Sequence, residues 1–368
     1  MIYLFTIAVC LVTGIIFKNT KVIGFWGLMV LAYLTGTANP LTTLDYEDYL
    51  IHYNIQGLEV SPFEKGYTLV SSFFLMHGFD YAHFRIIIAY IAFIFMFIGV
   101  CHFTNNVALF TGIYGISFFF LDAIQIRNLL MLAMLILGVG LLAEKNKKSK
   151  IFGIFLMFVS TQFHDLGYLF LLFFLICIFT DRERIEKYFN LYVGISFGLG
   201  VILLVFNSKT SIVNILYNFL LKFSSRSASA ENIMSKYGRG NGISTVIIIW
   251  ISLLLLYISL KFIINDLKQL GIYNDDHMKI LLVGCMVAFT VAFLAVLAPD
   301  YLRLDRVALC FYIILLCVLK GYLGTIRKVN PKKIGVILCL LLISIYINNK
   351  VWGSEYLQSI PFLIGIEK

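Results

Sequence analysis

The stretch FRIIIAYIAFIFMFIGVCHF, residues 84–103, decides the fold class, because a single arginine is the only permanently charged side chain in it. About twenty apolar residues in a helix cross the hydrocarbon core of a bilayer. Runs of this kind recur along the chain, which is 60% hydrophobic and 13% charged, with a mean hydropathy of +0.91. The sequence therefore predicts an all-α polytopic membrane protein, because a soluble domain needs far more polar surface.

The apolar runs predict about 12 transmembrane helices in a single integral membrane domain, residues 1–368. A further run, residues 66–79, is short and flanked by polar loops, so we expect a re-entrant segment there. The longest polar stretches, 39–65 and 207–242, are expected to be outer loops. The predicted spans are 2–17, 22–38, 84–103, 107–121, 128–143, 151–163, 166–180, 188–206, 243–264, 280–298, 307–319 and 334–348.

The distribution of charge predicts which side faces the cytoplasm. If the spans alternate, one side holds 17 basic and 7 acidic residues and the other 12 and 13, which together are the 29 and 20 of the chain. Lysine and arginine are enriched in cytoplasmic loops, so the side with 17 is the inner one. Six of the nine arginines fall on the outer side: Arg85, Arg127, Arg226, Arg239, Arg303 and Arg306.

Arginine on the outer side suits two roles. Its planar fork binds phosphate through two parallel hydrogen bonds, which indicates a diphosphate or another anion. The arginines can equally pair with the thirteen outer carboxylates. Composition fits both interpretations.

Several classes of function lack their motifs. The chain has no glycine-rich phosphate loop, no nucleotide motif and no HExxH, and its seven cysteines lie in or beside apolar runs without CxxC spacing. We therefore expect no cofactor, no metal, no disulfide and no nucleic-acid partner.

The stretch LDYEDYLIHYN, residues 44–54, predicts a short amphipathic helix on the outer surface. Its acids Asp45 and Asp48 and its tyrosines, among them Tyr49, recur at helical spacing. Acids accept hydrogen bonds from sugar hydroxyls and aromatic rings stack on sugar rings. A solvated helix with an aromatic anchor is the simpler alternative.

Two further motifs follow. In FEKGY, Glu64 precedes an apolar segment, where a carboxylate complements a helix N-terminus; binding a sugar is the second possible role. In LDAIQIRN, Asp122, Gln125, Arg127 and Asn128 form a polar island between two apolar spans. Arg127 there either pairs with Asp122 or captures a phosphate.

The stretch FHDLGY places His164 and Asp165 between two short predicted helices, in a position open to the outside. A histidine titrates near neutrality and can take a proton from a hydroxyl. The structural alternative is that Asp165 caps the next helix while His164 bonds to backbone. Further along, Arg303 and Arg306 in PDYLRLDR share one helical face, with Asp300 and Asp305 beside them as possible counter-charges.

In this order the motifs resemble the EpsG family, the Wzy-type polymerases of bacterial capsule, O-antigen and exopolysaccharide. The similarity runs over nearly the whole chain through short motifs. Asn128 departs from it, since a glutamine is more common there. The residues that carry the resemblance are Asp45, Tyr49, Glu64, Arg127, His164, Arg306 and Tyr312.

The resemblance implies an inverting glycosyltransferase of C-type architecture in the bacterial cytoplasmic membrane, with its active site outside. Donor and acceptor would be glycans on undecaprenyl diphosphate, and membrane lipid, a chain-length regulator and a flippase would be partners. Arg127, Arg303 and Arg306 would bind the diphosphate, and His164 would be the base, with Asp45 in reserve. Glu64, Tyr49, Asp48 and Gln125 would bind sugar.

Three other functions share parts of this pattern. A glycosyltransferase that uses a polyprenyl-phosphate sugar differs only in the donor. A flippase for lipid-linked oligosaccharides should have pseudo-symmetric halves and cationic residues within its spans, and neither is evident. A membrane O-acyltransferase uses an intramembrane histidine but needs polar residues on the cytoplasmic side, whereas these clusters map outside.

Overall fold

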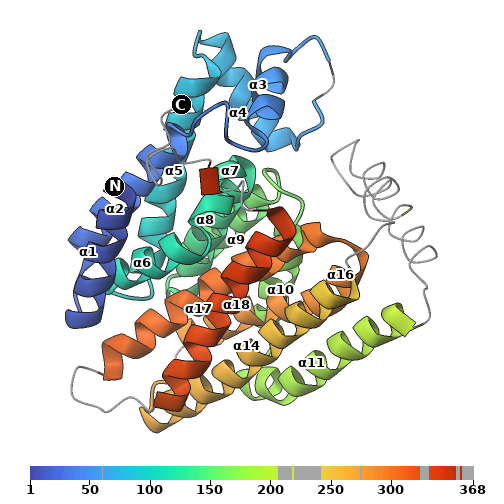
Figure 1. Ribbon diagram of the computed structural model, residues 1–368. Coiled ribbons are helices and arrows are strands. Elements are labelled where there is room, and N and C mark those ends of the chain that lie inside the picture. The colour runs from blue at the N-terminus through green and yellow to red at the C-terminus, as the bar shows by residue number, and fades with distance from the viewer. Residues whose placement is uncertain are drawn as a thin grey trace. The chain divides into compact units, whose positions relative to one another are not determined.

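The computed structural model is built of helices (Figure 1) and describes residues 1–59, 61–205, 218, 242–273, 276–323, 331–353 and 357–358. No strand occurs among these residues, which confirms the all-α prediction. Apart from residues 218 and 242, the predicted outer loop 207–242, with Arg226 and Arg239, lies outside the described residues.

The helices before residue 206 are α1 (Ile2–Ile16), α2 (Lys21–Gly36), α3 (Tyr46–Asn54), α4 (Lys65–Met76), α5 (Tyr81–Cys101), α6 (Val107–Ser117), α7 (Phe119–Ile124), α8 (Ile126–Ala143), α9 (Lys147–Ser160), α10 (Gly167–Phe179) and α11 (Arg182–Val205).

The second part of the chain continues in the same way. Its helices are α14 (Ile243–Gln269), α15 (Asp276–Met286), η2 (Val287–Thr290), α16 (Val291–Leu297), η3 (Pro299–Tyr301), α17 (Leu302–Leu323) and α18 (Pro331–Trp352).

Each predicted span contains a helix, and the length and composition of these helices make the chain a multi-pass membrane protein. Among the described residues, six segments are long and apolar enough to cross a bilayer: α5, α8, α11, α14, the run from α15 to α16, and α18. Four apolar helices are shorter: α1, α2, α6 and α10. Twelve spans and a C-type architecture therefore stay predictions.

Two predicted segments differ in detail from the observed helices. The run 107–121 is interrupted, because Phe118 has φ −131° and ψ −17°, outside the helical region, and separates α6 from α7. The segment 66–79 forms α4, whose 12 residues extend over only about 18 Å. That length is well short of a bilayer core of about 30 Å. Re-entry of α4 into the membrane stays a prediction.

The described residues form two compact units, and the first lies within residues 1–171, 313–327 and 352–368. Its centre is α8, which is buried on all sides and packs against both α5 and α9 (Figure 1). A Cβ on Gly99 of α5 would lie 2.7 Å from the backbone of Ile136, and one on Gly138 of α8 would lie 2.8 Å from the carbonyl oxygen of Gly153. Glycine at these points lets the helices approach closely.

Three loops of the first unit meet at one end of its helices. The Thr20 amide donates to the carbonyl oxygen of Asn105 at 3.0 Å, and its hydroxyl donates to Asn106 Oδ1 at 2.9 Å. His102 Nδ1 lies 2.8 Å from Glu144 Oε1. The C-terminal ends of α1, α5 and α8 therefore lie together, as the alternation of spans requires.

The second unit lies within residues 172–312 and 328–351 and is built around α11, α14 and α16. Trp250 Nε1 donates to the carbonyl oxygen of Ala292 at 2.7 Å, and the hydroxyls of Tyr192 and Thr290 are 2.6 Å apart. A Cβ on Gly200 would lie 2.6 Å from the Ala292 oxygen. Helix α16 is thereby held against α11 and α14.

Candidate active site

Helix α3 buries one face and exposes the other, as the sequence predicts. Tyr46, Tyr49 and Tyr53 are buried at helical spacing, whereas Asp48 is exposed on the opposite side. Asp45, the residue before the helix, is also exposed and has a left-handed backbone with φ 63°. The tyrosines of α3 therefore point into the protein, and both acids predicted to bind sugar or act as base lie on its surface.

Glu64 stands immediately before α4 and is completely buried. Its Oε2 atom pairs with Nη1 of Arg127, in the first turn of α8, and the two side chains are only 1% and 8% exposed. A buried carboxylate requires a counter-charge, because desolvation would otherwise neutralise it. The pairing joins two motifs that are 63 residues apart.

Aromatic side chains enclose the Arg127 guanidinium. Its carbon lies 4.2 Å from the ring centre of Phe63, 5.5 Å from that of Tyr49 and 6.0 Å from that of Tyr67. Its Nε donates to the Tyr49 hydroxyl at 3.1 Å. Arginine stacks on aromatic rings and pairs with carboxylates in one plane, so this cage fits arginine and not lysine.

Two polar atoms beside this pair have no hydrogen-bond partner among the described residues. They are Oε1 of Glu64 and the hydroxyl of Tyr67, and both are buried. Buried polar groups are nearly always hydrogen-bonded, to a ligand or to water if not to protein. The Arg127 cage, defined as Tyr49, Phe63, Glu64, Tyr67 and Arg127, thus has capacity for a polar ligand.

The polar island before α8 forms a separate cluster. Asp122 accepts from the Tyr114 hydroxyl at 2.9 Å and from Asn128 Nδ2 at 3.3 Å. The alternative that Arg127 pairs with Asp122 is wrong, because Arg127 pairs with Glu64. Gln125 is buried between α7 and α8, two residues before Arg127.

Arg85, which the charge count places on the outer side, is part of the core. It is fully buried and donates to the carbonyl oxygens of Thr35 and Ala123 and to the Tyr81 hydroxyl. These bonds tie α2, α5 and α7 together. Arg85 therefore has a structural role.

His164 lies in the tight turn between α9 and α10, and the turn contacts the start of α4. The carbonyl oxygen of Gln162 accepts from the amides of Gly66 at 2.9 Å and Tyr67 at 3.3 Å. A Cβ on Gly66 would come within 2.7 Å of Gln162. The motifs FEKGY and QFHDLGY therefore touch directly, and only glycine permits the contact.

The imidazole of His164 is buried and its Nδ1 faces a backbone amide. The Leu166 amide donates to this nitrogen at 3.2 Å, which places the imidazole proton on Nε2 in a neutral ring. The backbone bond agrees with the structural alternative for His164. A ring with its proton on Nε2 cannot take a second proton there, so the role of base requires the other tautomer.

Arg303 and Arg306 belong to the start of α17 in the second unit. Arg303 Nη2 donates to Asp300 Oδ1 at 3.0 Å, which confirms one of the two expected counter-charges. Arg306 and Asp305 are buried. Among the described residues, no group of three or more His, Cys, Asp or Glu side chains is arranged to hold a metal ion.

Sequence reasoning did not assign three residues that contribute to the site. Phe63 and Tyr67 flank Glu64 in PFEKGY, and Gln162 stands two residues before His164. Each lies inside a motif that was recognised for a neighbouring residue. The signal that could have found them was the motif as a whole, and the aromatic rings of Phe63 and Tyr67 pack against Tyr49.

A family model described as the EpsG family matches residues 21–363. The chain belongs to the EpsG family. The match includes all the residues described above, from α3 to α17. Comparisons with curated proteins and with solved structures gave no match.

EpsG proteins are Wzy-type polysaccharide polymerases, so membership indicates a polymerase-type, glycosyltransferase-like function for this chain. The motifs LDYEDY, FEKGY and QIRN meet in the Arg127 cage, and QFHDLGY is joined to it through Gln162. Four of the five motifs that resemble the family are therefore assembled in the first unit.

Proposed function

We propose that this protein is a polysaccharide polymerase that joins undecaprenyl-diphosphate-linked oligosaccharide repeat units at the outer face of the bacterial cytoplasmic membrane. The transfer is inverting and metal-independent. The observation that carries the proposal is the Arg127–Glu64 pair with its aromatic cage, tied through Gly66 and Gln162 to the His164 turn.

The reaction needs positive groups that stabilise the departing diphosphate and a base that takes the proton of the acceptor hydroxyl. The acceptor hydroxyl attacks the anomeric carbon as the bond to the departing diphosphate breaks, and the hydroxyl proton passes to a base. The resemblance to the family assigns Arg127, Arg303 and Arg306 to the charge on the diphosphate, because guanidinium groups stabilise such charge without a metal ion. Oε1 of Glu64 and the Tyr67 hydroxyl are suited to sugar hydroxyls. Tyr49 of the cage, Asp48 and Gln125 are assigned to the sugar by the resemblance to the family.

Two residues compete for the role of base. His164 is the first candidate, but taking a proton at Nε2 requires the tautomer in which the Leu166 amide loses its acceptor. Asp45 is the second candidate, because its carboxylate is exposed and needs no change of tautomer. A protonated His164 would instead donate to the diphosphate.

The cell-surface glycan of a deletion strain tests the function. A polymerase predicts loss of long chains while a single repeat unit is retained. Loss of one sugar from every repeat would point to a transferase that uses a polyprenyl-phosphate sugar. Accumulation of complete lipid-linked repeats on the cytoplasmic side would point to a flippase. Either of the last two results contradicts the proposal.

A further inference from the structure

The starts of α5 and α8 lie together at one end of the first unit. Arg85 of α5 donates to the carbonyl oxygen of Ala123, which stands shortly before α8 begins. At the opposite ends of the two helices, His102 Nδ1 lies 2.8 Å from Glu144 Oε1. Both helices are long and apolar enough to cross a bilayer, so their starts mark one of its surfaces.

Helix α4 has both of its ends at this surface. Glu64, the residue before α4, pairs with Arg127 in the first turn of α8. After α4, residues 77–80 lead directly to the start of α5. Asp80 and His83 pair with each other there, and their side chains are 64% and 70% exposed. An exposed carboxylate is costly within hydrocarbon, so the turn after α4 does not descend into the membrane.

Helix α4 crosses the start of α5. Tyr67, near the start of α4, and Phe74, about two turns later, both pack against Phe84, with ring centres 5.9 Å and 5.4 Å away. If the two helices ran alongside each other, Tyr67 and Phe74 would contact different residues of α5. Helix α4 therefore lies along the membrane surface and not through the membrane.

Two sides of α4 are covered by the protein itself. Tyr67 is buried on the side that faces the Arg127 cage and α5. On a second side, the Thr68 hydroxyl donates to Ser61 Oγ at 2.9 Å and the Ser72 hydroxyl donates to Gln56 Oε1 at 2.6 Å. The polar chain between α3 and α4 thus covers the second side.

The remaining side of α4 is apolar and open. Leu69, Phe73 and Met76 share it at helical spacing and are 71%, 53% and 77% exposed. Lys65, which is also exposed, lies one turn before Leu69 on the same side. These four residues are the open face of α4.

We propose that the open face of α4 is embedded in the lipid leaflet at this end of the first unit, with the helix lying along the membrane surface. The three apolar side chains contact the start of the acyl chains, and Lys65 extends to the lipid phosphates, as long basic side chains do at an interface. Lipid is the partner that fits, because the helix lies at the depth where the neighbouring spans begin. This position takes the place of the re-entry that the sequence predicts.

The proposal also sets the depth of the Arg127 cage. Helix α4 carries Tyr67 of the cage, and Glu64 of the cage directly precedes it. The cage therefore lies at the depth of the lipid head groups, where a polar group carried on a lipid can reach it. This inference does not depend on the reaction proposed for the cage.

The depth of α4 can be measured with nitroxide labels on the full-length protein in vesicles of phosphatidylcholine and phosphatidylglycerol. Relaxation of each label by oxygen, which concentrates in hydrocarbon, is compared with relaxation by a water-soluble nickel chelate. Single cysteines replace Leu69, Phe73 and Met76 in turn, in a Cys339→Ser background. We expect all three labels at one depth, about 5–10 Å below the head groups.

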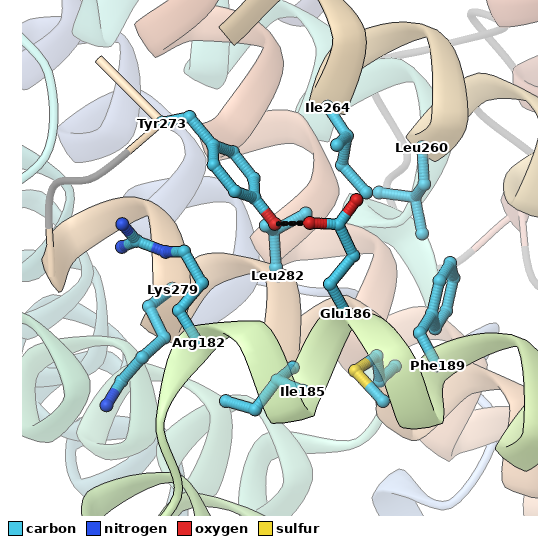
Figure 2. A pocket seen from close by; sticks show the side chains of 10 residues that line it. Arg182, Ile185, Glu186, Phe189, Leu260, Ile264, Tyr273, Lys279 and Leu282 are labelled. Atoms are coloured by element: carbon cyan, nitrogen blue, oxygen red, sulfur yellow. Dashed lines mark hydrogen bonds between the residues drawn. The ribbon is translucent and has the colours of Figure 1, made fainter. Parts of the chain in front are cut away.

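Two exposed apolar residues elsewhere in the chain serve as matched controls. Helix α11 is a candidate span with a polar start, where Glu186 accepts from the Tyr273 hydroxyl at 3.0 Å (Figure 2). Ile195, near the middle of α11 and 52% exposed, gives the value for the hydrocarbon interior. Leu58, between α3 and α4 and 83% exposed, gives the value for water.

Three results would each overturn the proposal. A re-entrant α4 would place the labels at Leu69 and Met76 at depths that differ by about 10 Å. Labels that relax like the one at Leu58 would place the open face in water. Labels shielded from both oxygen and the nickel chelate would show that a protein surface, and not lipid, covers it.

Discussion

His164 accepts a hydrogen bond from a backbone amide. Its role as the base can be tested by substitution. If His164 is the base, His164→Ala should lower turnover about 10²–10⁴-fold, the usual worth of general-base catalysis. Binding of lipid-linked substrate should change little, because a base acts on the transition state. Turnover in single-cycle assays and substrate binding can be measured separately on purified protein.

The controls for this change lie beside it and in the second unit. Asp165→Asn keeps the shape of the turn and removes one charge, so a mild effect leaves Asp165 a structural residue. Arg306→Ala should weaken both substrate binding and turnover, because the diphosphate is charged before the reaction begins. Wild-type turnover by His164→Ala at normal expression would transfer the role of base to Asp45.

The buried pair of Glu64 and Arg127 predicts a large loss of stability on removal of one charge. Glu64→Gln keeps the volume but leaves the Arg127 cation in an aromatic cage without a counter-charge. Breaking a buried ion pair in this way costs about 3–5 kcal/mol. The control is Asp181→Asn, whose exposed pair with Arg184 spans 3.9 Å and should contribute little. Chemical or thermal unfolding of the purified variants measures both losses of stability. Equal stabilities of Glu64→Gln and Asp181→Asn would show that the Glu64–Arg127 pair does not stabilise the fold.

Local spacing could not reveal which acid pairs with Arg127. Asp122 is five residues away in the chain and was the apparent partner, whereas Glu64 is 63 residues away. The backbone interruptions at Phe118 and Gln125 turn Asp122 toward Tyr114 and Asn128 instead. Sequence identifies which residues are costly to bury, but their partners are set by how distant helices pack.

At the scale of elements, α4 depends on a glycine to reach the His164 turn. Gly66→Ala would place a methyl group within 2.7 Å of Gln162, and overpacking of this kind costs about 1–3 kcal/mol. We expect the loss of the amide bonds to Gln162 to lower polymerisation more than it lowers stability, because the Arg127 cage and His164 would move apart. The chain length of the product and the melting temperature measure the two effects.

A matched helical glycine serves as the control for this element. A Cβ on Gly198 in α11 would meet no other atom within 4 Å. Gly198→Ala should therefore preserve activity and gain up to about 1 kcal/mol from helix propensity. If Gly66→Ala polymerises as well as Gly198→Ala, contact between α4 and the turn is not needed for activity.

The positions of the helices were predictable because apolar length alone specifies them. Every predicted run contains a helix, since a chain in hydrocarbon must satisfy its own backbone hydrogen bonds. The positions of the short helices α3 and α4 are harder to predict from the sequence, because these helices gain their stability from aromatic packing between them. Tyr49, Phe63 and Tyr67 form that packing, with ring centres 5.1–5.8 Å apart.

For the whole molecule, the loops of the first unit fall into two groups. Thr20, Asn105 and Glu144 belong to loops at one end, whereas Glu64, Arg127 and the turn at Gln162 are joined at another. The predicted inner loops form the first group and the predicted outer motifs the second. Hydrogen bonds and the ion pair thus divide the loops into the same two groups as the alternation of spans does.

Orientation in the membrane is the last prediction, and it rests on the excess of lysine and arginine in the inner loops. We expect Leu58→Cys to react with an impermeant thiol reagent from outside intact cells and Lys145→Cys to react only after permeabilisation. Both positions are exposed and lie outside the predicted spans. Cys339, the exposed one of the seven cysteines, is replaced by serine first. The reverse labelling would place the Arg127 cage on the cytoplasmic side, where polymerisation at the outer face could not use it. Membership of the EpsG family would stand, but the proposed site would have to be abandoned.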